Sequence, residues 1–423
     1  MKTRRFIITG SLMLTLSNLG VRLLGYVYRI VMGRMLTPYE YGVLNLALPL
    51  QFMVIVLTSA GIAPSIAKFV SEARAKGEDV NRLASSCLFY YTSAGALVGL
   101  FFLAIASPLA HSVFRDGSVL LPLQISAAAV PFGILISVYT GLFQGLKKVG
   151  YMSGVLLFEQ GMRLILAWLF VAAGFGVVGA IGGSTLGFAA ALPLAYVLLR
   201  GLGLRSGGPD FRLFREVFYF SIPTSITALS TFIFAYADIV LIGFYMDAAE
   251  VGIYSAASPA SRLIMAFTMA LYAVLIPSVS ETSIKGGRKK VRSHFVLSLL
   301  ALAAVMVPAT ALSLLFSEQI IALLFTEQYI FAAASFEILV VGVAFLSLFM
   351  INSAIFQGLG NPKTPMKILI GFAALDVAFN ILLIPRFGIE GAAFSTALAG
   401  VGAGILSTAA LAKYLNTSGE NAT

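Results

Sequence analysis

Four arginines and four acids interrupt long apolar stretches of this chain. The arginines are Arg22, Arg29, Arg163 and Arg262, and the acids are Glu159, Asp238, Glu337 and Asp376. An ionisable group in apolar surroundings costs a few kcal/mol or more, so such residues are functional candidates by default. A guanidinium forks onto two oxygens of a phosphate in a way that an ammonium cannot. The arginines therefore favour an anionic, phosphate-bearing ligand.

Spacing selects the arginines that act together. Arg22, Tyr26 and Arg29 follow the pattern i, i+4, i+7, which predicts that they share one face of a helix. A helix face with two cations should not contact lipid. We therefore predict that these three residues line a polar cleft and bind substrate. Arg262, about midway along another apolar stretch, joins them. For Arg29 the alternative is that its side chain reaches out to the membrane surface.

The acids have two interpretations each. Glu159 and Arg163 lie one helical turn apart, which favours an ion pair within one helix. Asp238, in FAYADIVLIG, is a candidate cation or proton site, or a partner for a cleft arginine. Asp376 with Asn380 is a similar candidate, although polar contacts between helices are an equal alternative. We predict that Asp238, Asp376, Glu159 and Arg163 couple an ion or balance charge.

The elements that hold these residues are predicted to be membrane-spanning helices. The chain is 59% hydrophobic and 11% charged, with a mean hydropathy of +0.95, whereas a soluble domain has about 25% charged residues. An apolar run of about 20 residues, folded as a helix, crosses a bilayer core of about 30 Å. The predicted spans are roughly 6–32, 41–66, 83–110, 118–145, 150–173, 176–200, 216–244, 250–277, 294–316, 329–357, 365–385 and 388–413.

The sequence repeats itself at a spacing of about 210 residues. FQGL occurs at 143–146 and again at 356–359, and YGVLNLALP (41–49) matches VGIYSAASP (251–259). This predicts an all-α, polytopic membrane protein of about 12 transmembrane helices in two six-helix bundles, 1–205 and 206–423. Six spans per copy give both copies the same orientation, so they are parallel repeats around a central cleft.

The basic residues predict the orientation in the membrane. With a cytoplasmic N-terminus, 21 of the 28 Lys and Arg fall on the inner side and three on the outer side, as the positive-inside rule requires. We therefore expect a multi-pass protein of the cytoplasmic membrane with both termini inside. The net charge of +10 then reflects orientation and needs no nucleic-acid partner.

Other motifs point to packing instead of chemistry. GFGVVG (174–179) lacks the strand and the acidic residue of a dinucleotide site, so it predicts a tight turn. Gly179, Gly183 and Gly187 after it are spaced for close helix packing. A lone cysteine, Cys87, and two distant histidines offer no metal site, so we expect no metal and no cofactor. Matched prolines in the second helix of each repeat predict kinks, either as hinges or as packing features. The N-terminus resembles a signal peptide, but the repeat requires a first helix there.

Several stretches resemble a known family. GRMLTPYEYGVLNLALPL, TSAGIAPSIAKFVSE, GFYMDAAEVGIYSAAS and FQGLGNPKTPMKILI are similar to polysaccharide transporters of the multidrug/oligosaccharidyl-lipid/polysaccharide exporter superfamily. The resemblance covers essentially the whole chain. It implies a flippase, not an enzyme, that moves a polyprenyl-(pyro)phosphate-linked oligosaccharide to the outer leaflet for glycan assembly. It also implies that Arg22 and Arg262 lie in regions where relatives place cleft arginines.

The resemblance leaves alternatives open. A cation-coupled multidrug exporter shares the twelve-span plan, and a peptidoglycan-precursor flippase usually has fourteen spans. A membrane-embedded glycan polymerase would need a catalytic constellation, and none is visible in the sequence. The expected partners are the lipid-linked glycan, membrane lipid, H+ or Na+ as a coupling ion, and glycan-assembly enzymes, with the chain as a monomer.

Overall fold

The structure, a computed structural model, describes residues 2–204, 207–285 and 287–417. Side chains are described from Ser17 onward, apart from some positions within 223–234, 270–277 and 284–289 and residue 417. All regular structure in these ranges is helical, with no strand. The predicted all-α class is confirmed.

The contacts divide the chain into two compact units. Unit 1 comprises Met1–Tyr236 and Asp247–Gly252, and unit 2 comprises Ala237–Met246 and Ile253–Thr423. Contacts thus assign the first part of α8 (Phe211–Tyr245) to unit 1 and its last part to unit 2. The predicted division at residues 205 and 206 follows the sequence repeat and remains a prediction.

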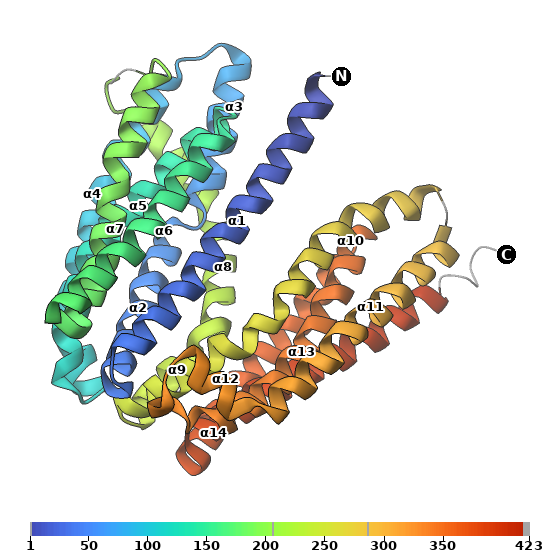
Figure 1. The fold of residues 1–423 in the computed structure, drawn as a ribbon. Coiled ribbons are helices and arrows are strands. Elements are labelled where there is room, and N and C mark those ends of the chain that lie inside the picture. Colours follow the sequence, from blue (N-terminus) through green and yellow to red (C-terminus); the bar gives the residue numbers. More distant parts are fainter. Residues whose placement is uncertain (1, 205–206, 286, 418–423) are drawn as a thin grey trace. The chain divides into compact units, whose positions relative to one another are not determined.

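Unit 1 is built from long helices that lie side by side (Figure 1). They are α1 (Lys2–Met35), α2 (Pro38–Ser59), α3 (Ile62–Lys76), α4 (Val80–Pro108), α5 (Leu120–Gly145), α6 (Val149–Phe170) and α7 (Gly176–Gly201). Short helices η1 (Leu109–Val113), η2 (Gly117–Val119) and η3 (Val171–Phe175) join some of them. The start of α2 is fixed by a capping box: Thr37 accepts from the Glu40 N–H, and Glu40 accepts from the Thr37 N–H at 3.0 Å, as at many helix N-termini.

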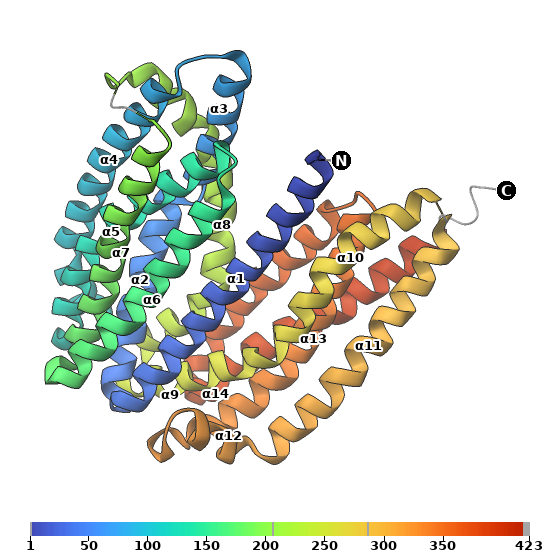
Figure 2. The same cartoon turned by 45° about the horizontal axis from the view of Figure 1, so that its top comes forward.

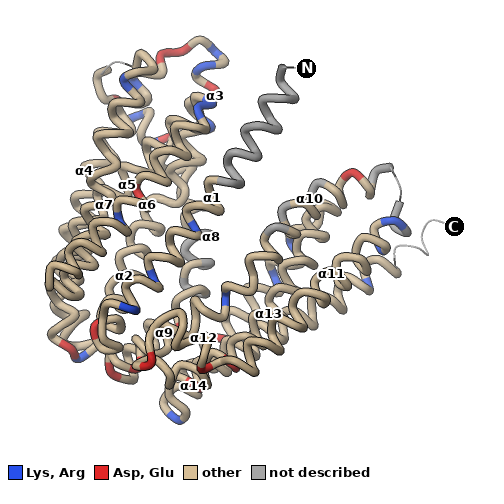
Figure 3. The backbone as a smooth tube through the Cα atoms, in the orientation of Figure 1, with Lys and Arg blue, Asp and Glu red and all other residues tan. Residues whose placement is uncertain are grey.

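Unit 2 contains α9 (Ala248–Arg262) from Ile253 onward, with α10 (Ala266–Lys285), α11 (Gly287–Leu315), α12 (Ser317–Leu324), α13 (Ala332–Gly358) and α14 (Lys363–Thr417). Two short helices, η4 (Leu263–Met265) and η5 (Glu327–Tyr329), complete it. The turned view in Figure 2 shows the short α12 near one end of α11 and α13. In Figure 3, Lys and Arg gather near the α3–α4 connection of unit 1 and near the start of α11 in unit 2.

The helices account for about twelve membrane spans. Eight helical segments of the described residues are long and apolar enough to cross a membrane, and two of these, Val149–Gly201 and Lys363–Asn416, have 53 and 54 residues. Each of the two folds back on itself at glycines with positive φ, Gly174 (91°) and Gly388 (60°), a conformation that glycine adopts without strain. Ten spans result, and α1 and α8 make twelve. The tight turn predicted at 174–179 is confirmed.

The second helix of each repeat is broken. Between α2 and α3 the chain leaves the helix at Ala60 and Gly61, and η4 interrupts the path from α9 to α10. Pro49 lies inside α2 and Pro259 inside α9. Both interruptions come after these prolines, so kinks at the prolines themselves remain a prediction. Their role as hinges remains a prediction.

The two FQGL copies adopt the same structure. After α5, Lys148 N–H donates to Phe143 O and Lys147 has a φ of 60°; after α13, Asn361 N–H donates to Phe356 O and Gly360 has a φ of 79°. Both are helix ends of the Schellman type. A Cβ on Gly145 would lie 2.7 Å from Val70, and one on Gly358 would lie 2.8 Å from Val279. The repeated glycine is needed where this helix crosses the second helix of its own copy.

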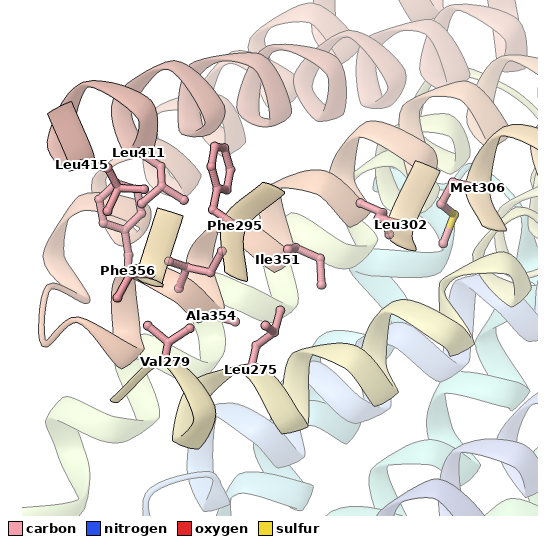
Figure 4. Packing of buried hydrophobic residues seen from close by; sticks show 12 residues of the cluster. Leu275, Val279, Phe295, Leu302, Met306, Ile351, Ala354, Phe356, Leu411 and Leu415 are labelled. Atoms are coloured by element: carbon pink, nitrogen blue, oxygen red, sulfur yellow. The ribbon is translucent and has the colours of Figure 1, made fainter. Parts of the chain in front are cut away.

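The core of unit 2 is a continuous apolar cluster between its long helices. Figure 4 shows Leu275 and Val279 of α10, Phe295 of α11, Phe356 of α13 and Leu411 of α14 around it. Because lipid is as apolar as these side chains, packing complementarity holds the helices together, rather than exclusion of water.

Candidate functional site

Unit 1 contains a cavity of about 220 Å³ that is lined by both polar and apolar side chains. It is lined by residues of α1, α2, α6 and the middle of α8: Val21, Gly25, Tyr28, Arg29, Tyr41, Leu44, Asn45, Leu48, Pro49, Phe52, Gln160, Arg163 and Tyr236. All thirteen residues belong to unit 1. Two of them, Arg29 and Arg163, are among the predicted site residues.

The face of α1 that lines the cavity is Val21, Gly25, Tyr28 and Arg29, which follows the helical pattern i, i+4, i+7, i+8. It differs from the predicted face by one residue. Arg22 is exposed and Tyr26 is half-buried, and neither lines the cavity. Of the three residues predicted on this helix, the structure places only Arg29 there.

Arg29 is the cation that faces the cavity without a carboxylate beside it. Its Nη2 donates to the Tyr236 hydroxyl at 3.0 Å, and its Cζ lies 5.9 Å from the centre of that ring. The residues that line the cavity include no Asp or Glu. A guanidinium held by neutral groups keeps its charge available for an anion.

Arg163 is held on several sides. Its Nη1 contacts Glu159 Oε1 at 3.4 Å and Gln160 Oε1 at 3.0 Å, and its Nε donates to Ser184 Oγ at 3.2 Å. Its guanidinium also lies over three aromatic rings, those of Tyr28, Phe52 and Phe188, at 5.8, 4.8 and 5.2 Å. The predicted Glu159–Arg163 ion pair is confirmed, with both side chains 7% exposed.

Close packing of α6 against α7 positions Arg163. A Cβ on Gly187 would lie 2.2 Å from Arg163 Cγ, and one on Gly183 would lie 2.2 Å from the Ala167 nitrogen. The glycine stripe therefore allows the close approach that its spacing predicted. On the other side Tyr28 of α1 donates its hydroxyl to Ala180 O of α7 at 3.3 Å, which ties α1 to the same wall.

Several cavity residues escaped the sequence reasoning. Tyr28, Tyr41, Asn45, Gln160 and Tyr236 are uncharged, so a search for charges passes over them. Two weak signals were present. Tyr28 lies one residue before Arg29, and Gln160 lies one turn before Arg163. Polar residues at these positions of an apolar helix indicate a polar face.

Unit 2 holds a second polar cluster, in which two of the predicted acids meet. Asp238 Oδ2 accepts from the Tyr254 hydroxyl at 2.7 Å, and its Oδ1 accepts from the Ile239 N–H at 2.8 Å. Asn380 Nδ2 donates to Asp376 Oδ1 at 3.0 Å. Both carboxyl groups are buried and interact electrostatically with each other.

The donor set of this cluster suits a hard cation. Beside the carboxylates lies Thr396, which neighbours both Tyr254 and Asp376. The Asn380 Oδ1 is buried and accepts no hydrogen bond from the residues that the structure describes. Oxygen ligands of this kind suit hard cations such as Na+. Arg262, the remaining predicted arginine, is half-buried in unit 2 and interacts electrostatically with both acids.

The other intramembrane acid has a structural partner. Glu337 of α13 accepts from Ser317 Oγ of α12 at 2.5 Å. In the described ranges no group of three or more His, Cys, Asp or Glu side chains could hold a metal ion.

A family model described as "Polysaccharide biosynthesis protein" matches residues 7–283, more than half of the chain. A second model, MatE, matches residues 223–382.

Three of the curated relatives are archaeal proteins. An uncharacterized membrane protein of Methanocaldococcus jannaschii is 33% identical over 190 residues, which cover 44% of this chain and 37% of the relative. The probable low-salt glycan biosynthesis flippase Agl15 of Haloferax volcanii is 26% identical, over 45% of this chain and 40% of the relative. The chain thus matches about two fifths of the length of these two relatives. A second uncharacterized membrane protein of M. jannaschii is 24% identical over 92% of this chain and 94% of its own length.

Among solved structures, the inward-facing conformation of a multidrug resistance MATE family transporter of the MOP superfamily matches with a TM-score of 0.78. It is 17% identical, over 95% of this chain and 96% of that one. At this identity the likeness concerns the fold. The chain belongs to the polysaccharide biosynthesis protein family, and it shares its fold with this membrane transporter of the MOP superfamily.

Proposed function

We propose that this chain flips a polyprenyl-(pyro)phosphate-linked oligosaccharide from the cytoplasmic to the outer leaflet, for the assembly of a cell-surface glycan. It does so by alternating access of its two repeats, 1–205 and 206–423, with no covalent chemistry. It resides in the cytoplasmic membrane with both termini inside. The observation that carries the proposal is Arg29, a cation in a cavity whose lining residues include no carboxylate.

The phosphate of the headgroup binds at this cavity. Arg29 supplies a charge-assisted contact, and Arg163 supplies a second guanidinium on the same wall. Two guanidinium groups that line one cavity suit the several negatively charged oxygens of a phosphate or diphosphate. Arg22, Tyr26 and Arg262 contact other parts of the substrate. The flippase name of the relative Agl15 supports this substrate class.

The polar cluster of unit 2 supplies the coupling ion. Asp238 and Asp376 are buried beside neutral oxygen donors, and they bind Na+ or H+ in one conformation of the transport cycle. A cation that binds one conformation better shifts the equilibrium toward it, by as much as its difference in affinity. Glu159 stays with Arg163 and balances its charge.

Arg29→Ala tests the proposal. In cells whose own copy is deleted, this variant should leave less than a tenth of the surface glycan while the amount of protein in the membrane stays unchanged, because the headgroup loses its main cation. Arg34→Ala is the matched control, since Arg34 lies on the same helix and does not line the cavity. A normal amount of surface glycan with Arg29→Ala would show that this cavity does not bind the headgroup.

A second candidate is a cation-coupled drug exporter, favoured by the MatE match over residues 223–382. A cavity lined by two arginines disfavours the export of cationic drugs through it, because like charges repel each other. Drug sensitivity of the deletion strain with intact surface glycan would establish this candidate instead.

A further inference from the structure

Glu159 lies behind the cavity and reaches it only through Arg163. It is absent from the lining residues, and its side chain is 7% exposed. In the described part of the chain its hydrogen-bond partner is Nη1 of Arg163, at 3.4 Å. A buried carboxylate with one cation beside it depends on that cation for its charge.

Arg163 contacts Glu159 on one side and lines the cavity on the other. Its Nε and Nη1 are engaged by Ser184, Gln160 and Glu159. Its Nη2 carries two further N–H groups, and no described residue accepts a hydrogen bond from them. The residue lines the cavity. An anion in the cavity therefore meets the open side of a guanidinium whose other side already holds a carboxylate.

The charges around the cavity can be counted. Arg29 of α1 and Arg163 of α6 are positive, and Glu159 is negative. The other ionisable side chains that line the cavity are phenols, namely Tyr28 of α1, Tyr41 of α2 and Tyr236 of α8, and we count no charge for them. The neighbouring helix α7 contributes the uncharged Ser184. The site thus has one net positive charge before a ligand arrives.

We propose that Glu159 takes up one proton when a diphosphate headgroup binds in this cavity. The inference rests on the proposed function and deepens it, because the number of protons distinguishes two classes of substrate. A singly charged phosphodiester neutralises the site as it stands. A doubly charged diphosphate diester leaves one excess negative charge in a buried place, and protonation of Glu159 removes it.

The physical reason is the cost of a buried charge that has lost its partner. When the diphosphate binds Arg163, Glu159 stays buried but has to share the positive charge of Arg163 with the ligand. The neutral acid is then the lower-energy form. By reciprocity, a proton on Glu159 must strengthen diphosphate binding by the same factor as diphosphate strengthens the binding of the proton.

Two small probes separate the classes. P1,P2-dimethyl diphosphate carries two charges and dimethyl phosphate carries one, and neither titrates near neutral pH. The purified full-length protein in detergent is titrated with each probe by calorimetry, in two buffers of different ionisation enthalpy, so that the difference gives the protons exchanged. We expect close to one proton taken up with the diphosphate and none with the monophosphate. The affinity for the diphosphate should fall about tenfold per pH unit across the range of the uptake.

Variants identify the group. Glu159→Gln should bind the diphosphate with no proton uptake and with a pH-independent affinity. Glu72→Gln, which removes an exposed carboxylate of α3, should behave as the wild type. Binding of the diphosphate without proton uptake by the wild type would overturn this inference and leave the proposed function standing. If neither probe binds in a way that Arg29→Ala abolishes, the proposed anion site itself fails.

Discussion

Among single residues, the two arginines that line the cavity of unit 1 differ in how firmly they are held. Arg163 is tied by hydrogen bonds to α6 and α7 and lies among three rings, so it both holds the wall together and presents its open edge. Among the residues that the structure describes, the hydrogen bond of Arg29 is the one to the Tyr236 hydroxyl. A residue with few partners can exchange them for a ligand at low cost. Arg29 is therefore the better candidate for the first contact with substrate.

In unit 2 the Tyr254 hydroxyl stabilises a buried carboxylate. Tyr254→Phe removes the donor at 2.7 Å from Asp238, and a hydrogen bond to a charged group contributes about 1.5–3 kcal/mol. We expect a Tm several degrees lower for the purified variant, measured by intrinsic fluorescence. Tyr245→Phe, 40% exposed at the end of α8, is the control. An equal Tm for both variants would contradict the importance of this contact.

The sequence predicts which residues are candidates better than it predicts their companions. Charges in apolar stretches stand out, so residue type and position alone make Arg29, Arg163, Asp238 and Asp376 candidates. Spacing along one helix also predicts the Glu159–Arg163 pair. That Asp238 and Asp376 share one cluster depends on how helices 138 residues apart in the chain pack, and no local pattern contains this. The same limit explains why the cavity is lined by Val21, Gly25 and Tyr28 of α1, each one residue before a predicted position.

At the level of helices, glycines decide how closely α6 and α7 approach. Gly183 and Gly182 are neighbours on α7, yet a Cβ on Gly183 would lie 2.2 Å from the Ala167 nitrogen, while one on Gly182 would meet nothing within 4 Å. The contact is with backbone, which cannot move aside as a side chain does.

The two positions make a matched pair of substitutions. Gly183→Ala should destabilise the protein by about 1–3 kcal/mol, because overpacking forces the two helices apart. Gly182→Ala should be neutral or stabilise it by up to about 1 kcal/mol, since alanine favours the helix. Thermal unfolding followed by size-exclusion chromatography measures both. Similar losses for the two variants would show that the helices are not packed as described.

The elements were predictable to different degrees. Long apolar runs predict the helices, and the repeat predicts six per copy. The hairpins within Val149–Gly201 and Lys363–Asn416 follow from turn glycines that the sequence displays. The short helix α12 was not predicted, because eight residues between two spans leave no periodic signal.

For the whole molecule, composition and the distribution of basic residues determine the class of protein before any contact is known. A chain with 11% charged residues cannot cover itself with a water-facing surface, so most of its helices must lie in lipid. The proposed function adds one requirement to this membrane protein: a place where a charged headgroup can be held away from hydrocarbon. In our proposal the cavity with Arg29 is that place in unit 1, and the acid cluster in unit 2 is the place for a cation.

The most direct test of the proposed flippase function measures the movement of the lipid itself. The lipid-linked glycan that accumulates in cells lacking this chain is incorporated into vesicles with the purified protein, and its exposure to a membrane-impermeant glycosidase is followed over time under a cation gradient. Wild type and Arg34→Ala should expose the glycan, and Arg29→Ala should expose no more than vesicles without protein. Exposure at the wild-type rate by Arg29→Ala would contradict the claim that the cavity of unit 1 holds the headgroup.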